Sequence, residues 1–217
     1  KRLVAAGLDL AAERDRHGAN ALIWAAGSGH LEVCRWLVEA RSVGGGGLDV
    51  AGVQRGRRGY SGRTPLHWAS RNGQLDVVRW LLTEAPWGQG QPVDAPTADG
   101  TTALCWAAWQ AQVETLRLLL HFRADPRVLN SYGCDPALWA CQSPAGSEQV
   151  LATCRLLASP LGGGLAFDRI NGNGHSCAHK AAQRGNRRVC EWLVGWAAER
   201  PPSLAARHFG RDWEGHC

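Results

Sequence analysis

The chain has 217 residues, a formal net charge of +5 and a hydrophobic share of 45%, which is ordinary for a soluble protein. No run approaches the roughly 20 apolar residues of a membrane-spanning helix, so we expect no membrane segment. The positive charge is too modest to make nucleic acid the favoured partner.

A glycine recurs every 33 to 44 residues at one place in a repeated unit: Gly18, Gly62, Gly100, Gly133, Gly174 and Gly215. Two positions after five of these glycines stands a side chain that can accept a hydrogen bond from the first amides of a helix. These residues are Asn20, Thr64, Thr102, Asp135 and Ser176. Pro65 and Pro136 follow directly, where proline suits a helix start. The pattern predicts five short helices that begin in register.

Each of these first helices is rich in small residues, and a second helix with apolar residues at helical spacing is expected after it. Gly29, Gly73 and Gly185 are expected to end three of the first helices, because glycine adopts the left-handed conformation at low cost. The second helices contain, in chain order, Cys34-Arg35-Trp36-Leu37-Val38, Val78-Arg79-Trp80-Leu81-Leu82, Leu116-Arg117-Leu118-Leu119-Leu120, Cys154-Arg155-Leu156-Leu157-Ala158 and Cys190-Glu191-Trp192-Leu193-Val194.

Two units depart from this pattern. In the third unit, Ala111 replaces the glycine that ends the first helix. The fourth unit has about five extra residues around Gln142 to Ser147, and the sequence does not determine its inter-helix turn.

The segment Thr64-Pro65-Leu66-His67-Trp68-Ala69, followed by Gly73-Gln74-Leu75-Asp76-Val77-Val78, resembles the ankyrin repeat. Gly29-His30-Leu31-Glu32-Val33 and Ala124-Asp125-Pro126 show the same resemblance. It implies an all-α solenoid of helix-turn-helix units joined by short β-hairpin-like loops. We expect one array over residues 1–217, a fragment of a longer one. Its parts are a partial repeat at 1–14, repeats at about 15–58, 59–96, 97–129, 130–170 and 171–211, and the start of another at 212–217.

The resemblance also implies a concave binding groove, lined by hairpin tips and by the outer side of the first helices. On the hairpins, the candidate contact residues are Arg16, His17, Tyr60, Ser61, Arg63, Asp99, Tyr132, His175 and Trp213. On the helices, they are Arg71, Asn72, Trp109, Gln110, Gln142, Gln183 and Arg184. Arginine, tyrosine and tryptophan are common at interface hot spots, and Asp99 is the only acid here. We therefore predict a protein partner with an acidic and apolar surface, the alternative being that these are solvated tips.

Seven tryptophans occupy two repeat positions: Trp24, Trp68, Trp106 and Trp139 at one, and Trp36, Trp80 and Trp192 at the other. Stacking on bases or sugars is conceivable, but both positions are apolar in every copy except at Lys180, so core packing is the favoured interpretation. Trp109 differs, because the other copies carry mostly polar residues at its position.

The chain has eight cysteines and no Cys-x-x-Cys pair, so we expect reduced thiols in an intracellular protein of the cytoplasm or nucleus. His175-Ser176-Cys177-Ala178-His179 gathers ligand-type residues, but the repeat itself accounts for Ser176, Cys177 and His179. We therefore predict no metal and no other cofactor.

Catalytic motifs are missing from the sequence, which has no phosphate-binding loop and no nucleophile elbow, so we predict no enzyme activity and no small-molecule substrate. The leading hypothesis is a protein–protein interaction module, acting as a monomeric adaptor, scaffold or targeting segment. One alternative is a structural spacer in a larger protein. Another is nucleic-acid binding through the basic loop at Arg55–Arg58 and the arginine series Arg35, Arg79, Arg117 and Arg155.

Overall fold

The computed structural model describes residues 13–39, 62–84 and 92–200, and these ranges contain ten helices in five consecutive pairs. The pairs are α2 (Ala21–Gly27) with α3 (Leu31–Glu39), α4 (Pro65–Arg71) with α5 (Leu75–Thr83), α6 (Ala103–Trp109) with α7 (Val113–His121), α8 (Pro136–Cys141) with α9 (Ser147–Ala158), and α10 (Cys177–Gln183) with α11 (Arg187–Ala198). Tyr60, Ser61, Trp213 and the arginines at 55–58 lie outside the described residues.

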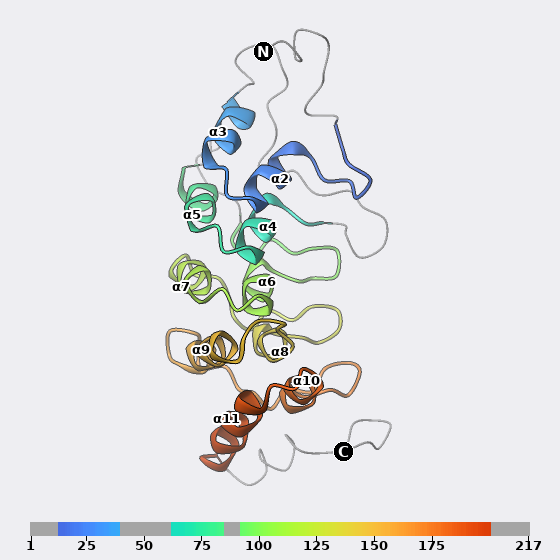
Figure 1. Ribbon diagram of the computed structural model, residues 1–217, viewed down its shortest axis with the longest axis vertical. Coiled ribbons are helices and arrows are strands. Elements are labelled where there is room, and N and C mark those ends of the chain that lie inside the picture. The colour runs from blue at the N-terminus through green and yellow to red at the C-terminus, as the bar shows by residue number, and fades with distance from the viewer. Residues whose placement is uncertain (1–12, 40–61, 85–91, 201–217) are drawn as a thin grey trace. The chain divides into compact units, whose positions relative to one another are not determined.

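The chain forms two compact units, residues 1–103 and residues 104–217. Within the first unit, α2 packs against α4 and α3 against α5; within the second, α8 packs against α10 and α9 against α11 (Figure 1). Like helices therefore lie beside like helices in each unit, which confirms the predicted all-α repeat arrangement. Such stacking lets each pair bury its apolar face on its neighbours.

All five first helices begin where the sequence predicts. Asn20 Oδ1 accepts a hydrogen bond from the Ile23 amide at 2.9 Å, and Asp135 Oδ1 accepts one from the Leu138 amide at 3.0 Å. The Ser176 hydroxyl accepts from the His179 amide at 3.4 Å. At α4 the first-turn histidine completes the cap, because Nδ1 of His67 accepts from the Thr64 amide at 3.1 Å.

The turn uses a left-handed residue in four of the five pairs, as the glycines predicted, whereas the turn of the fourth pair, residues 142–146, contains none. Gly29, Gly73 and Gly185 have φ values of 80°, 73° and 65°. Ala111 adopts φ 52° at the same place, although it carries a side chain. The same backbone hydrogen bond closes the turn there, from the Gln112 amide to the Ala107 carbonyl at 2.9 Å. The repeat geometry thus holds an alanine in a conformation that costs an L-residue about 1–2 kcal/mol.

The fourth pair accommodates its extra residues in two places. Residues 142–146 form a longer connection than in the other pairs, and Gly146 precedes α9. Helix α9 then has 12 residues, where α7 has 9. The added length therefore goes into a wider turn and an additional helical turn, while the end of α9 keeps its place in the stack.

The hairpins before α2, α8 and α10 are each closed by one polar side chain. Asp15 Oδ1 accepts from the amides of His17 and Ala19, each at 2.8 Å. Asn130 and Asn171 each accept in the same way from the amides two and four residues further on, at 3.0 to 3.1 Å. Gly18, Gly133 and Gly174 supply the left-handed residue. In each of these loops, one side chain therefore satisfies two backbone amides of its own turn.

The tryptophan positions are only partly in the core. Trp80 and Trp106 are buried, as predicted, and Trp68, Trp139 and Trp192 are half-buried. The prediction is wrong for Trp24 and Trp36, which are 61% and 46% exposed. Trp24 turns its ring toward the hairpin, because its indole N–H finds a carboxylate partner there.

Candidate functional site

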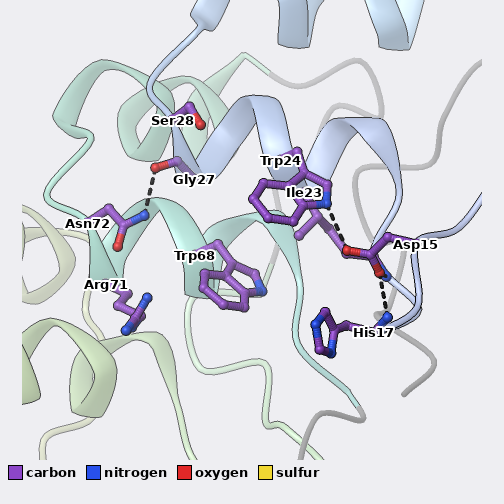
Figure 2. A pocket seen from close by; sticks show the side chains of 10 residues that line it. Asp15, His17, Ile23, Trp24, Gly27, Ser28, Trp68, Arg71 and Asn72 are labelled. Carbon is purple, nitrogen blue, oxygen red and sulfur yellow. Dashed lines mark hydrogen bonds between the residues drawn. The ribbon is translucent and has the colours of Figure 1, made fainter. Parts of the chain in front are cut away.

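A pocket of about 410 Å³ lies in the first unit, between the hairpin at residues 15–19 and the helices α2 and α4. Its lining residues are Asp15, His17, Ala19, Ile23, Trp24, Gly27, Ser28, Trp68, Arg71 and Asn72. Figure 2 shows the two indoles facing the space between the hairpin and Arg71. A pocket of this size is typical of ligand-binding sites, which measure about 300–1,000 Å³.

The Trp24 wall of the pocket is held in place by Asp15. The indole Nε1 of Trp24 donates to Asp15 Oδ2 at 3.0 Å, while Oδ1 of the same carboxylate holds the hairpin amides. Burial alone raises the pKa of Asp15, but the hydrogen bonds from Ala19, His17 and Trp24 outweigh it and bring the pKa below its usual value. The carboxylate stays ionised at neutral pH and orders both the loop and the indole.

The Trp68 wall carries positive charge. The guanidinium carbon of Arg71 lies 5.2 Å from the centre of the Trp68 ring, and that of Arg63 lies 5.6 Å from it. Both distances fall within the roughly 6 Å range of a cation–π contact. The pocket therefore combines apolar indole surface with guanidinium groups at its side.

Asn72 has a structural role in this pocket. Its Nδ2 donates to the Gly27 carbonyl at 2.7 Å, and Nε2 of Gln74 reaches the same carbonyl at 3.3 Å. Asn72 thereby ties the end of α4 to the end of α2. The side-chain amide of Asn72 therefore contributes to the pocket by holding α2 and α4 together.

Of the contact residues predicted in the first unit, His17, Arg71 and Asn72 meet in this pocket. Nε of Arg16 donates to Nε2 of His17 at 3.0 Å, which places Arg16 at the rim. Asp99 serves its own hairpin: its carboxylate accepts from the hydroxyls of Thr97 and Thr101. Burial raises the pKa of Asp99, but these hydrogen bonds hold it below its usual value.

In the second unit, Trp109 belongs to an aromatic cluster. Its ring lies edge-to-face with Trp106 at 6.0 Å and with Trp139 at 6.1 Å between centroids. Trp109 remains half-buried, as do the predicted contact residues Gln110 and Gln142. The cluster fixes the Trp109 ring while part of its surface stays accessible to a partner.

The other predicted contact residues of the second unit differ in how exposed they are and in whether their polar groups bind a neighbouring repeat. Tyr132 is 56% exposed at its hairpin tip, and Gln183 is exposed at the end of α10. Arg184 is also exposed, but its Nε donates to the Gln142 carbonyl at 2.8 Å and so links two consecutive repeats. His175 is half-buried, with its ring 6.2 Å from that of His179.

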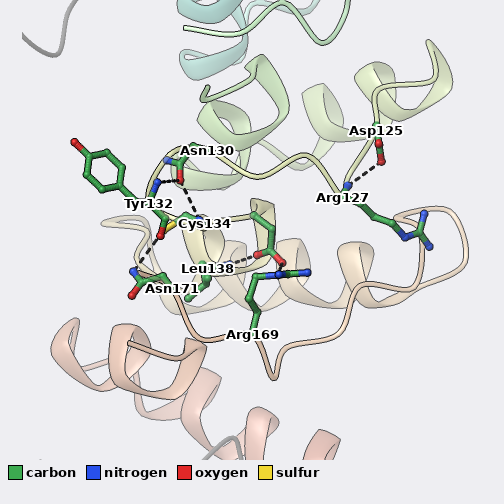
Figure 3. Close-up of polar contacts among 9 residues, drawn as sticks. Asp125, Arg127, Asn130, Tyr132, Cys134, Leu138, Arg169 and Asn171 are labelled. Carbon is green, nitrogen blue, oxygen red and sulfur yellow. Dashed lines mark hydrogen bonds and ion pairs between the residues drawn. The ribbon is translucent and has the colours of Figure 1, made fainter. Parts of the chain in front are cut away.

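An ion pair that the sequence does not predict joins the start of α8 to the segment before α10, beside these tips. Nε of Arg169 is 3.1 Å from Oδ2 of Asp135, whose other oxygen caps α8 (Figure 3). Burial raises the pKa of Asp135, although the Leu138 amide and Arg169 act in the opposite direction. On the hairpin backbone, the Gly172 amide donates to the Tyr132 carbonyl at 2.8 Å. These contacts position the Tyr132 tip.

The sequence does not predict that Trp24 and Trp68 line a pocket, because their repeat position is apolar in most copies. One residue gave the signal: Lys180 occupies the same position in α10, and a lysine there is half-buried rather than enclosed. A charged residue at one copy of a position indicates that this position reaches solvent. The arginines of the second helices lie outside this pocket. Arg79, Arg117 and Arg155 are exposed, and Arg35 pairs with Glu84 at 3.0 Å.

Within the described ranges, no group of three or more histidine, cysteine or acidic side chains is arranged to hold a metal ion. Three thiols, those of Cys141, Cys154 and Cys177, are instead buried together in the second unit. Hydrogen bonds with Cys154 and Cys177, together with burial, raise the pKa of Cys141. Residues 13–39, 62–84 and 92–200 also contain no helix long and apolar enough to cross a membrane.

The family model for ankyrin repeats matches the chain in three overlapping stretches, residues 1–89, 48–130 and 104–200. A comparison with curated proteins gives no significant match.

Proposed function

This chain belongs to the ankyrin-repeat family, whose members generally act as protein–protein interaction modules, and we propose that it binds a protein partner through its hairpins and first helices. The observation that carries the proposal is the pocket of the first unit, where Trp24, Trp68 and Arg71 line one concave space. Tryptophan and arginine are the residue types most often found at binding hot spots.

The contacts behind the pocket support recognition by a preformed surface. Asp15 holds the Trp24 ring, and Asn72 ties α4 to α2. Side chains fixed before binding lose little conformational entropy when a partner arrives. In the second unit, the edge-to-face contacts of Trp109 serve the same purpose.

The charge of these surfaces supports a partner with acidic and apolar groups. Arg16, Arg63 and Arg71 lie at or beside the pocket, and the carboxylate that lines it, Asp15, already accepts three hydrogen bonds. Complementary charge would steer an acidic partner to this face. The proposed role is an intracellular adaptor or targeting module that acts as a monomer and without catalysis.

A triple variant tests the proposal. Replacing Arg71, Trp109 and Tyr132 with alanine removes one predicted contact from the first unit and two from the second. The matched control replaces Arg79, Arg117 and Arg155, which are exposed on the second helices. After urea unfolding shows that both variants are folded, quantitative affinity purification should show partners lost from the first variant and kept by the control. An unchanged partner list for both variants would favour a structural spacer.

Nucleic-acid binding is separated from protein recognition by a gel-shift titration at several salt concentrations. Contacts to phosphates would make the affinity fall steeply with salt. We expect no such salt-dependent binding.

A further inference from the structure

The pocket of the first unit has two kinds of surface, and together they specify a ligand more narrowly than the family does. One kind is the indole surface of Trp24 and Trp68, which favours an apolar or aromatic group. The other is the pair of guanidinium groups next to Trp68, which favours an anion. A ligand that uses the whole pocket has to offer both.

The cationic side is formed by Arg71 and Arg63. Both approach the Trp68 ring, at 5.2 and 5.6 Å, and Arg71 also lines the pocket. A carboxylate suits such a place, because a guanidinium presents its donors in a planar fork that matches two carboxylate oxygens. The hydrogen bond from Arg16 to His17 brings a third guanidinium to the opposite rim.

A cationic ligand fits this pocket poorly. The Trp68 ring, which could attract a cation, already has two guanidinium groups within cation–π range. The lining carboxylate, Asp15, accepts hydrogen bonds from two backbone amides and from the Trp24 indole. Among the residues that line the pocket in the described part of the chain, a lysine or an ammonium group would therefore meet positive charge and a carboxylate that already accepts three hydrogen bonds.

We propose that this pocket binds an acidic peptide segment in which an aromatic side chain stands next to a carboxylate side chain. The aromatic ring lies against Trp24 and Trp68, and the carboxylate lies against Arg71. This inference rests on the proposed function, because it names the partner chemistry of the same surface. The choice of occupant comes from the charge complementarity of the pocket.

The test uses the full chain and three fluorescein-labelled octapeptides that differ only at two central positions: Phe-Glu, Phe-Lys and Ala-Glu. Fluorescence anisotropy should show that the Phe-Glu peptide binds, with both other peptides weaker by about tenfold or more. Raising the salt concentration should weaken the Phe-Glu peptide further, because the arginine contacts lie near the surface. Equal binding of the Phe-Glu and Phe-Lys peptides would overturn the charge part of the proposal.

Paired variants locate the binding. Arg71→Ala and Trp24→Ala should each weaken the Phe-Glu peptide by about tenfold, whereas Arg79→Ala and Trp36→Ala, which replace residues outside the pocket, should leave it unchanged. Trp24→Phe keeps an aromatic ring without the N–H donor to Asp15, so it should weaken the Phe-Glu peptide less than Trp24→Ala does. If Trp24→Ala does not fold, the comparison of Arg71→Ala with Arg79→Ala carries the test. Equal losses from the pocket and control variants would overturn the location.

The peptide titrations and the purification with the triple variant together separate this inference from the proposed function. If none of the peptides binds while the triple variant at Arg71, Trp109 and Tyr132 still loses its partners, the peptide assignment is wrong and protein recognition stands. If the peptides bind as expected but the triple variant keeps every partner, the pocket chemistry holds and the proposed function is wrong.

Discussion

The side-chain amide of Asn72 donates to the backbone carbonyl of Gly27 at 2.7 Å, and Arg184 makes the equivalent bond to the carbonyl of Gln142 at 2.8 Å. Both donors precede the left-handed glycine of their own inter-helix turn, Gly73 and Gly185. Both acceptors lie at the end of the preceding first helix. A single repeat position thus supplies a link between neighbouring repeats in each unit.

Replacing Asn72 with alanine should lower the free energy of unfolding by about 1 kcal/mol, the usual net contribution of one intramolecular hydrogen bond. Urea unfolding followed by circular dichroism measures this change. Arg79→Ala is the control, because Arg79 is exposed on α5. A loss for Asn72→Ala no greater than that of the control would show that the link to Gly27 does not stabilise the stack.

His67 should make the first unit sensitive to acid. Its side chain is fully buried; Nδ1 accepts from the Thr64 amide and hydroxyl at 3.1 and 2.9 Å, and Nε2 lies 3.2 Å from the Thr101 carbonyl, to which it donates. Burial lowers its pKa from 6.5 to about 4. The folded state therefore holds a neutral imidazole, and its stabilising effect is complete above pH 6.5 and lost as the pH falls toward 4.

The full effect of that pKa difference is about 3 kcal/mol. Unfolding free energies measured from pH 7 down to pH 4 should show the loss. The variant His67→Gln should be less stable than the natural chain at pH 7 and closer to it at pH 4, because glutamine does not titrate. A gap between the two that stays constant with pH would contradict the assignment.

Among residues 13–39, 62–84 and 92–200, two residues other than glycine occupy the left-handed region, Ala111 at φ 52° and Arg123 at φ 65°. Replacing either with glycine should raise the unfolding free energy by about 1 kcal/mol, because the steric cost of that conformation is removed. Arg123→Gly is the simpler test, since Arg123 is exposed and loses no buried contact. Ala107→Gly, inside α6, is the matched control and should destabilise. The same sign for Arg123→Gly and Ala107→Gly would refute the explanation.

The thiols of Cys141, Cys154 and Cys177 should resist alkylation while the protein is folded. All three are buried, and the pKa values of Cys141 and Cys177 are raised, so little thiolate forms at neutral pH. Cys134 is only half-buried and should react before these three. Maleimide labelling at pH 7.5, followed by peptide mass spectrometry, gives the order of reaction. Labelling of Cys141 as fast as that of Cys134 would show that the second unit opens readily.

The sequence was sufficient for the helix starts and the fold, because capping residues and turn glycines act within their own repeat. Asn20, Asp135 and Ser176 cap the helices they were expected to cap. Contacts between repeats were harder to foresee. The repeat pattern tells which face a side chain occupies but not which atom of the next repeat lies opposite it. The sequence therefore predicts Asn72 and Arg184 as contacts with a partner, whereas in the structure their side chains donate to the carbonyls of Gly27 and Gln142 in the preceding repeat.

The same limit explains the tryptophans. Apolar residues in most copies of a position indicate burial on average, yet Trp24 is 61% exposed because its N–H is drawn to Asp15 on the hairpin. Trp36 is also exposed, and nothing in the described structure explains it. The domain boundaries and the contact residues of the two units stay predictions, and the variants at Arg71, Trp109 and Tyr132 test three of these contact residues.

The hairpins at residues 15–19 and 130–134 offer positions at which the proposed binding surface can be changed. Asp15 and Asn130 satisfy the amides of their own loops, so the two residues that follow each of them, at 16–17 and 131–132, do not determine the loop shape. Varying those four positions in a library would change the surface offered to a target while the helices remain stacked. The array could in this way be directed toward new binding targets without any change to its helices.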